Sequence, residues 1–440
     1  MSSASDVHVG IDIGTSTVKV AAFNTRGRVI ASSRAALPQL NIRGAAATQP
    51  LAELVRITER VVGEVARGAT PSLVGLVTQR DTVIVLDGAG VPGRDLISWR
   101  DVRHVRHGSL WDALAAEPGV LPDGPLSVRS LASYLTERWT GEAAETAGTR
   151  PRHFDAPALE RLRALRTDID VPRSVGPGES VAVAHDAAPM PAGVPLVLSS
   201  GDKNAELVGA GVTAPARAGI SLGSAISLGM MVQGGRPQET PGAVISAAAL
   251  ADSWNVETGL VVGLQGLDLL RRLSSQPELA PDARWRTDLW CIPAFAGALD
   301  QARAVGMLAG LRETSTAADL ARAWAQGVAC ELARLAPCVE AASGPIEDVR
   351  VYGGGADAGW QRLLADILDR PVRLVDDPWC GARGALIAAL LMRGRRETAD
   401  AILAEAEATM SEVIVPDAAT RSRVARYRER YQMLLAAGVV

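Results

Sequence analysis

The same short pattern occurs twice in this 440-residue chain, once near its start and once near its middle. Residues 7–23 place two apolar stretches around Gly14-Thr15-Ser16, and residues 218–232 place two around Gly223-Ser224. An apolar run, a glycine-containing turn and a second apolar run are typical of two antiparallel strands. Two such hairpins, one in each half of the chain, predict a duplicated domain.

Strands and helices are expected to alternate after each hairpin. The spacing of apolar residues predicts helices over 50–67 and 360–368, and a long helix from Thr316 to about Ala342 that Thr316 and Asp319 would cap. Further strands are predicted from Val29 and at 73–77, 82–86, 243–249, 253–257 and 349–352. This mixed order indicates the α/β class.

Length sets the number of domains. A chain of 440 residues exceeds a typical single core, so two domains of roughly 200 residues each are expected. We place the N-terminal domain at 6–212 and the C-terminal domain at 213–440, with a hinge near 209–216. The proline-rich passage 141–195 is expected to form turns and short helices on the first domain.

Composition argues against several kinds of partner. A net charge of −4 predicts neither nucleic acid nor a membrane as partner, and no apolar stretch is long enough to span a bilayer. No signal peptide is recognised, so a cytoplasmic protein is expected. The four cysteines lack Cys-x-x-Cys spacing, which argues against zinc and predicts reduced thiols. His104 and His107 are expected on a solvated face beside Arg103 and Arg106.

Only two lysines occur among the 45 basic residues, and both lie in segments rich in glycine and hydroxyl groups. In the first segment, Gly14 would let backbone amides approach an anion, while Thr15, Ser16 and Lys19 would bind phosphate. Asp12 would repel phosphate, so its expected role is to hold Mg²⁺. The alternative is an ordinary hairpin whose glycine only permits a turn.

The second lysine follows Asp202, which lies between Gly201 and an alanine-rich run that reads as a helix. Its carboxylate is therefore expected at a helix N-terminus, where it could also be a simple cap. A third cluster, residues 353–356, ends a strand and begins a helix, and its glycines suit close approach of a nucleotide. It fits neither the dinucleotide-binding fingerprint nor the P-loop.

Taken in order, these segments resemble the FGGY carbohydrate kinases, within the superfamily of actin, hexokinase and the 70-kDa heat-shock chaperones. The resemblance implies two ribonuclease H-like, actin-like ATPase domains with a central cleft. The segments that carry it are Ile11-Asp-Ile-Gly-Thr-Ser-Thr-Val-Lys19, Gly201-Asp-Lys-Asn-Ala-Glu-Leu-Val-Gly-Ala-Gly211, Leu222-Gly-Ser-Ala225, Val351-Tyr-Gly-Gly-Gly-Ala356 and Gly381-Ala-Arg-Gly-Ala-Leu386.

This resemblance implies an ATP-dependent kinase with Mg²⁺ as cofactor. Asp202 would be the general base and Asp12 the metal ligand. The residues implied to bind ATP and its phosphates are Gly14, Thr15, Ser16, Lys19, Gly223, Ser224, Gly353, Gly354, Gly355 and Ala356. Dimers are common among such proteins, so a homodimer is implied as the candidate assembly.

Two further segments resemble the acceptor side of the family. Thr78-Gln-Arg-Asp81 is more similar to the Asn-Gln-Arg-Glu of glycerol kinases than to the Gln-Met-His-Gly of xylulose kinases. Trp99-Arg-Asp-Val-Arg103 fits the family pattern Trp-x-Asp-x-Arg. The acceptor, a small polyhydroxylated molecule, would contact Arg80, Asp81, Trp99, Asp101, Arg103 and Asp202. Alternatively, Arg80 and Asp81 form an exposed ion pair of little energetic value.

One departure bears on function. The family's second phosphate motif usually reads Gly-Thr-Ser-Gly, whereas this chain has Gly223-Ser-Ala-Ile226. A degenerate kinase, in which this altered motif no longer supports turnover, stays open as an alternative. An actin-like ATP-binding sensor without a small acceptor is a separate alternative. Triols, pentuloses, pentitols and cyclitols all stay open as acceptors.

Overall fold

The computed structural model describes residues 6–68, 70–176, 182–276, 285, 288–295 and 305–438. These residues form two compact units. Unit 1 holds the described residues of 1–209, 247–251 and 381–405, and unit 2 holds those of 210–246, 252–380 and 406–440. The chain passes from unit 1 to unit 2 after Gly209, within the range 209–216. Unit 1 also contains 381–405, a segment that chain order alone had assigned to the C-terminal half.

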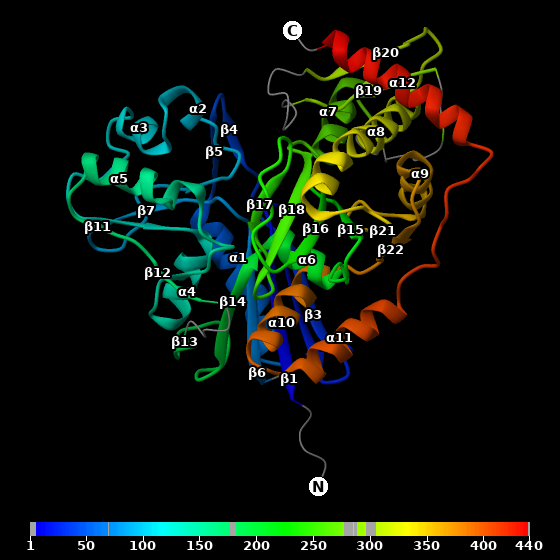
Figure 1. Ribbon diagram of the computed structural model, residues 1–440. Coiled ribbons are helices and arrows are strands. Elements are labelled where there is room, and N and C mark those ends of the chain that lie inside the picture. Colours follow the sequence, from blue (N-terminus) through cyan, green and yellow to red (C-terminus); the bar gives the residue numbers. More distant parts are fainter. Residues whose placement is uncertain are drawn as a thin grey trace. The chain divides into compact units, whose positions relative to one another are not determined.

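Unit 1 is built on a six-stranded sheet in the order β13-β14-β6-β1-β2-β3 (Figure 1). The first three strands form the predicted antiparallel meander, and β6 and β14 continue it in parallel with β1. Strand β1 is almost entirely buried, as expected for a central strand covered on both faces, whereas β3 is largely exposed. The bounds are β1 Val7–Ile13, β2 Thr17–Asn24, β3 Val29–Ala36, β6 Pro71–Thr78, β13 Ala182–Val183 and β14 Pro195–Gly201.

Unit 2 repeats this plan with the order β17-β18-β16-β15-β21-β22. Strands β15, β16 and β18 form an antiparallel meander, and β21 and β22 run parallel to β15. The predicted duplication and α/β class are therefore confirmed. The bounds are β15 Arg217–Leu222, β16 Ile226–Gln233, β17 Val244–Ala247, β18 Ser253–Leu260, β21 Asp348–Tyr352 and β22 Val372–Leu374.

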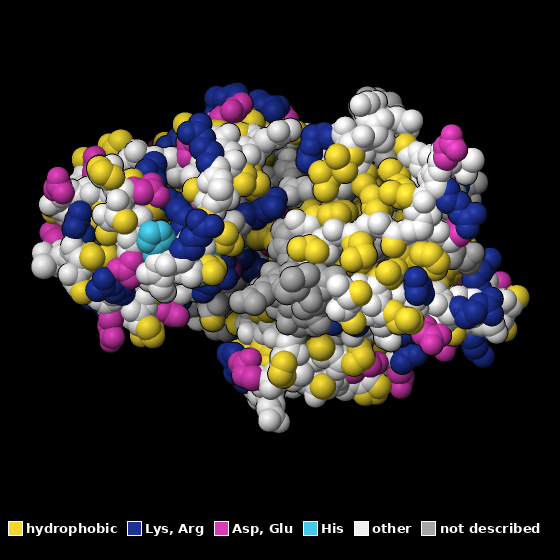
Figure 2. Space-filling view, turned by 90° about the horizontal axis from the view of Figure 1, so that it is seen from above, with side chains coloured by type: hydrophobic (Ala, Val, Ile, Leu, Met, Phe, Trp, Pro, Cys, Tyr) yellow, Lys and Arg dark blue, Asp and Glu magenta, His cyan; other side chains and the backbone are white. Residues whose placement is uncertain are grey.

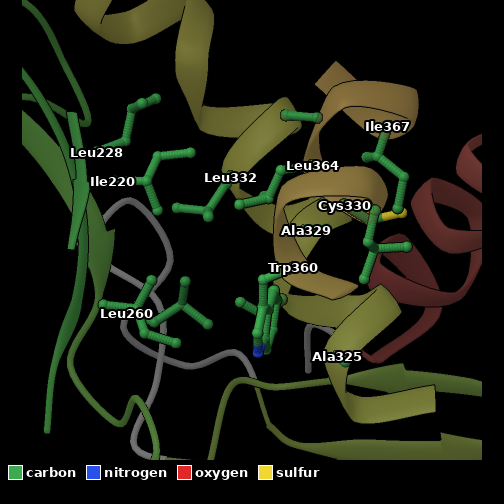
Figure 3. Packing of buried hydrophobic residues seen from close by; sticks show 14 of the residues in the cluster. Ile220, Leu228, Leu260, Ala325, Ala329, Cys330, Leu332, Trp360, Leu364 and Ile367 are labelled. Carbon is green, nitrogen blue, oxygen red and sulfur yellow. The ribbon is translucent and has the colours of Figure 1, made fainter. Parts of the chain in front are cut away.

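The core of unit 2 lies between its sheet and two helices, α8 (Ala317–Ser343) and α9 (Ala358–Leu368). Figure 3 shows Ile220, Leu228 and Leu260 of the strands facing Leu332 and Leu364 of these helices. Helix α8 begins with the predicted capping box, in which Thr316 and Asp319 bond reciprocally. The other elements of unit 2 are α7 Gln265–Ser274, β19 Trp290–Ile292, β20 Met307–Ala309 and α12 Arg421–Gly438.

Two glycines of central strands explain how α10 (Cys380–Met392) packs in unit 1. A Cβ atom on Gly10 would lie 1.9 Å from the carbonyl oxygen of Ala382, and one on Gly75 would lie 2.5 Å from that of Ala385. Only glycine admits the helix backbone so close to the sheet. Helix α1 (Leu51–Ala66), also as predicted, belongs to the same unit, and so does α11 (Arg396–Ala408) as far as Glu405.

The rest of unit 1 follows β3, lies between β6 and β14, or follows β14, in smaller sheets and short helices. Trp111 stacks on Phe154 within a separate apolar cluster there, at a centroid distance of 6.2 Å. The elements are β4 Asn41–Arg43, β5 Ala46–Gln49, β7 Ile84–Asp87, β8 Leu96–Ile97, α2 His104–His107, α3 Leu110–Ala115, β9 Leu126–Arg129, α4 Leu131–Thr140, β10 Ala144–Glu145, a 3₁₀ turn Arg152–Phe154, α5 Ala156–Leu165, β11 Ile169–Asp170, β12 Arg173–Ser174 and α6 Asp202–Gly209.

Three properties of the described residues bear on the expectations from composition. Acidic and basic side chains are both scattered over the face shown in Figure 2. Among the described helices, none is long and apolar enough to cross a bilayer. The four cysteines are free thiols, as predicted, and three of them are buried.

Candidate functional site

The β1–β2 hairpin brings Asp12 and Lys19 together, because its register pairs these two residues across the strands. The connecting turn is closed by a hydrogen bond from the Gly14 amide to the Thr17 carbonyl oxygen, at 3.0 Å. Ser16 at its tip is exposed, and Thr15 is half-buried. The hairpin therefore presents hydroxyl groups and a lysine beside a carboxylate, as the sequence predicted.

The Asp12 carboxylate is 4% exposed, and its Oδ1 atom has no hydrogen-bond partner among the described residues. Its other oxygen, Oδ2, lies against Gly381 of α10, where a Cβ atom would come within 2.3 Å. Burial raises the pKa of Asp12 to about 7, although the positive charge of Lys19 opposes the rise. A buried, unpaired carboxylate oxygen is a ligand that a hard divalent cation would satisfy.

Asp202 is the first residue of α6, as predicted. Its Oδ1 atom accepts a hydrogen bond from the Lys203 amide at 2.9 Å. Burial raises its pKa, and the charges of Lys203 and Arg80 oppose that rise. The side chain of Arg80 crosses Gly201, where a Cβ atom would lie 2.1 Å from Arg80 Cγ. The glycine before Asp202 thus allows an arginine to reach the carboxylate.

Lys203 forms an ion pair with Glu206, one turn further along α6, at 2.9 Å. Burial by itself would lower the pKa of Lys203, but the negative charges of Glu206 and Asp202 outweigh it and the pKa is raised. Glu206 also interacts with Asp12. Sequence reasoning missed Glu206, although its spacing from Asp202 put both on one face of the helix.

Thr15 links the β1–β2 hairpin to the predicted acceptor residues. Its hydroxyl accepts a hydrogen bond from Trp99 Nε1 at 2.9 Å, and its carbonyl oxygen accepts one from Gln49 Nε2 at 2.8 Å. Gln79 Nε2 in turn donates to Gln49 Oε1 at 2.9 Å. Gln49 is fully buried and had no recognisable signal in the sequence, because a single polar residue before a helix is common.

Asp81 has a left-handed backbone conformation, with φ of 53°, and its Oδ1 accepts a hydrogen bond from the Arg152 amide at 2.9 Å. The Arg152 guanidinium donates to the carbonyl oxygen of Trp99 at 3.5 Å. Arg80, Asp81 and Trp99 are all half-buried. They are therefore held in one region of unit 1, and each has surface left for a ligand.

Asp101 and Arg103 are placed differently, because both are buried and bound to each other. The Asp101 carboxylate accepts hydrogen bonds from Arg103 Nε at 2.9 Å and from the Ala47 amide at 3.1 Å. The Arg103 guanidinium also pairs with Glu117. These contacts hold the loop that carries Trp99.

The prediction for His104 was wrong. It is half-buried, and its ring lies edge-on to that of His153 at a centroid distance of 5.5 Å. Burial, helped by the charge of Arg152, lowers the pKa of His153 to about 4. Local charge density suggested a solvated face, but residues 152–154 return to cover His104. His107 is exposed, as predicted.

The predicted nucleotide residues of unit 2 meet at one end of its sheet. The Gly355 amide donates to the Leu222 carbonyl oxygen at 3.1 Å, so residues 353–356 lie beside the β15–β16 turn that contains Gly223 and Ser224. Gly353 has a φ of 103°, which favours glycine. A Cβ atom on Gly354 would meet no heavy atom of the described residues within 4 Å. The backbone at Gly354 therefore borders open space, which close approach of a nucleotide would require.

Gly263 and Leu264 complete this end of unit 2 and were missed from the sequence. Their amides donate to the carbonyl oxygens of Ser224 and Gly223 at 2.8 and 3.0 Å. The sequence-predicted site residues thus form two groups, one in each unit. Among the described residues, no three carboxylate, histidine or cysteine side chains form a complete metal cage. The arrangement would suit an ion that takes few ligands from protein and the rest from phosphate and water, as Mg²⁺ does.

Two models of the FGGY family of carbohydrate kinases match the chain, the N-terminal domain at residues 7–139 and the C-terminal domain at 246–392. The chain is 27% identical to xylulose kinase of Streptomyces coelicolor over 430 residues, covering 86% of each protein. It is 23% identical to glycerol kinase of Bordetella parapertussis over 499 residues, covering 98% of this chain and 97% of that one. The crystal structure of xylulose kinase from Rhodospirillum rubrum has a similar fold, with a TM-score of 0.77, 20% identity and 98% of each chain covered.

Proposed function

Because the chain belongs to the FGGY family of carbohydrate kinases, we propose that Asp202 is the base that takes the proton from the acceptor hydroxyl. The protein is an ATP-dependent phosphotransferase that acts on a sugar or polyol, and its two units have the actin-like ATPase fold. The observation that carries the proposal is the half-buried Asp202 carboxylate at the start of α6, where the cations Arg80 and Lys203 both act on it.

In the proposed step, the acceptor O–H bond breaks and its proton passes to an Asp202 oxygen. The acceptor oxygen forms a bond to the γ-phosphorus while the bond from that phosphorus to the β–γ bridging oxygen breaks, which releases ADP. Lys19, the amides of Thr15 and Ser16 and the hydroxyl of the exposed Ser16 would neutralise charge on the transferred group, with Gly14 letting the backbone approach it. Arg80 and Lys203 would favour the ionised form of Asp202 until the proton moves.

Asp12 would hold Mg²⁺, directly or through water. Its unpartnered Oδ1 atom is the contact that supports this role. When bound, the ion would neutralise phosphate charge and orient the phosphate oxygens. Gly381 matters here as well, because any side chain at that position would meet the Asp12 carboxylate.

Unit 2 would bind ATP. Residues Gly353, Gly354, Gly355 and Ala356 would lie against the nucleotide, with Gly223 and Ser224 beside the phosphates. The hydrogen bond between Gly355 and Leu222 supports this grouping, since it ties the two segments together. Compared with the family pattern Gly-Thr-Ser-Gly, this chain lacks a hydroxyl and a glycine at 225–226. Ser224 therefore remains as the side-chain donor of this turn.

The acceptor would bind in unit 1 as a small neutral polyol, ketose or cyclitol. Arg80, Asp81 and Trp99 would supply its polar contacts, because all three retain exposed surface. Asp101 and Arg103 would act indirectly, by holding the loop of Trp99, since their own polar atoms are engaged with each other. We also propose a cytoplasmic homodimer, and sedimentation of the purified protein would test the dimer.

The test is a panel of triols, pentuloses, pentitols and cyclitols, each offered with ATP and Mg²⁺ while ADP release is measured. With the best acceptor, Asp202→Asn is expected to lower kcat by a factor of about 10² to 10⁴, the usual loss for a general base. Asp123→Asn, at a fully exposed carboxylate, is the matched control. Near-normal turnover of Asp202→Asn would exclude it as the base. ADP release that no acceptor changes would favour the ATP-binding sensor.

A further inference from the structure

Gly148 touches Ser200 so closely that no larger residue fits between them. A Cβ atom on Gly148 would lie 2.3 Å from Ser200 Oγ and 3.2 Å from the carbonyl oxygen of Ala247. The φ angle of Gly148 is not in the left-handed region, so its backbone would accept any residue. The demand for glycine at this position is therefore one of space, and it is set by Ser200.

The turn that carries Gly148 is fixed to the strand before Asp202. Thr146 and Thr149 close the turn through mutual bonds, including one from the Thr146 amide to Thr149 Oγ1 at 3.0 Å. Thr146 Oγ1 also donates to the carbonyl oxygen of Ser199 at 3.2 Å. Both threonines are buried. The turn at 146–149 is thus a rigid element attached to the end of β14.

Ser200 bridges the corner between β14 and α6. Its hydroxyl accepts a hydrogen bond from Asn204 Nδ2 at 2.9 Å, and the same amide donates to the carbonyl oxygen of Ala247 at 2.7 Å. Ser200 lies two residues before Asp202, and Asn204 lies two residues after it. The bond between them spans the corner where the Asp202 backbone turns from strand to helix.

Helix α6 is packed closely against α10 on one side. On its α10 side, a Cβ atom on Gly384 would lie 1.8 Å from the carbonyl oxygen of Ala205. The regular pairing of β14 with β6 is also interrupted between Leu198 and Gly201, so the ladder alone does not fix the last residues of the strand. The position of Asp202 then depends on side-chain contacts at Ser200 and on the packing of α6.

We propose that the turn at residues 146–149 positions Asp202 for proton transfer, through the contact of Gly148 with Ser200. Gly148 and Ser200 are positioning residues and do not touch the acceptor. The inference rests on the proposed role of Asp202 as base. A displacement of a reacting group by about 1 Å can cost a factor of about 10² in rate, so a methyl group at Gly148 has a measurable consequence.

The experiment is a double-mutant cycle on the full-length enzyme. Gly148→Ala is expected to lower kcat by about 10²-fold and to leave the KM for ATP unchanged, because ATP is bound elsewhere. Ser200→Ala removes the oxygen that the new methyl group would meet. The double variant Gly148→Ala with Ser200→Ala should therefore be more active than Gly148→Ala alone. Gly93→Ala is the control, since a Cβ there meets no described atom within 4 Å.

A second variant guards against poor folding of Gly148→Ala. Thr146→Val keeps the shape of the side chain but removes its bond to Ser199, and it should lower kcat less, again without a change in the KM for ATP. A double variant no better than Gly148→Ala, or normal kcat in both Gly148→Ala and Thr146→Val, would overturn the inference. Asp202→Asn is measured in parallel to separate the two proposals. Full activity of Asp202→Asn would contradict the proposed role of Asp202 as base, whereas a loss there with normal activity in the other two variants would contradict only the role of the turn.

Discussion

Asp12 and Lys19 are directly opposed residues of the β1–β2 hairpin, and no other element is needed to bring them together. The pairing places a carboxylate and an ammonium group at the same end of the sheet. Burial disfavours the charged carboxylate, and Lys19 is the strongest opposing charge. One hairpin therefore supplies both the proposed metal ligand and the proposed phosphate cation.

The first prediction concerns the metal. Asp12→Asn keeps the size of the side chain but removes its negative charge, so the Mg²⁺ concentration for half-maximal activity should rise by about 10- to 100-fold. Turnover measured across a Mg²⁺ titration, at saturating ATP and acceptor, checks this. An unchanged Mg²⁺ requirement would refute the metal role of Asp12.

The second prediction concerns the ion pair beside Asp202, the proposed base. Lys203→Met leaves the mostly buried Glu206 without its ion-pair partner and leaves Arg80 as the remaining cation that acts on Asp202. Breaking a buried pair costs up to about 3–5 kcal/mol. We expect a lower free energy of unfolding in urea and lower kcat. Adding Glu206→Gln should restore part of the stability. If the double variant instead loses the sum of the two single losses in unfolding free energy, the two side chains do not act as a pair.

The third prediction separates two glycines of the nucleotide segment. Gly353→Ala should destabilise unit 2 by more than about 1 kcal/mol, because its φ is positive and its Cβ would meet Leu222. Gly354→Ala has open space and should leave the melting temperature unchanged, yet raise the KM for ATP roughly tenfold, or about 1.4 kcal/mol. An unchanged KM for ATP in Gly354→Ala would remove this residue from the nucleotide site.

The fourth prediction concerns pH and stability. Glu145 is fully buried, and its Oε2 has no hydrogen-bond partner among the described residues, although Arg150 Nε lies 3.9 Å away. Burial raises its pKa, and the charge of Arg150 opposes that rise. A carboxyl with a raised pKa in the folded state stabilises below the unfolded pKa of about 4.3 and loses that contribution as pH rises through its folded pKa.

Glu145→Gln has no proton to lose, so its melting temperature relative to the wild type should increase as pH rises from acidic to neutral. Glu142→Gln, at an exposed neighbour, should show no such trend. Parallel melting curves of Glu145→Gln and the wild type at every pH would contradict the assignment.

Much of the fold could be predicted because it depends on local patterns. The hairpins at Gly14 and Gly223, the capped helix that begins after Thr316 and the helix that begins at Asp202 all lie where apolar periodicity and turn residues placed them. The site motifs were recognisable for the same reason, since each is a short continuous segment. Their roles as ligands stay predictions.

The sequence by itself thus determined the duplicated α/β plan and the segments that carry the chemistry, because spacing along the chain reports local structure. Only the tertiary structure decided which polar groups are engaged. It paired Asp101 with Arg103, covered His104 with His153, joined Thr15 to Gln49 and set Gly148 against Ser200. Such contacts depend on how distant segments pack, and packing is a property of the whole folded unit that no local pattern encodes.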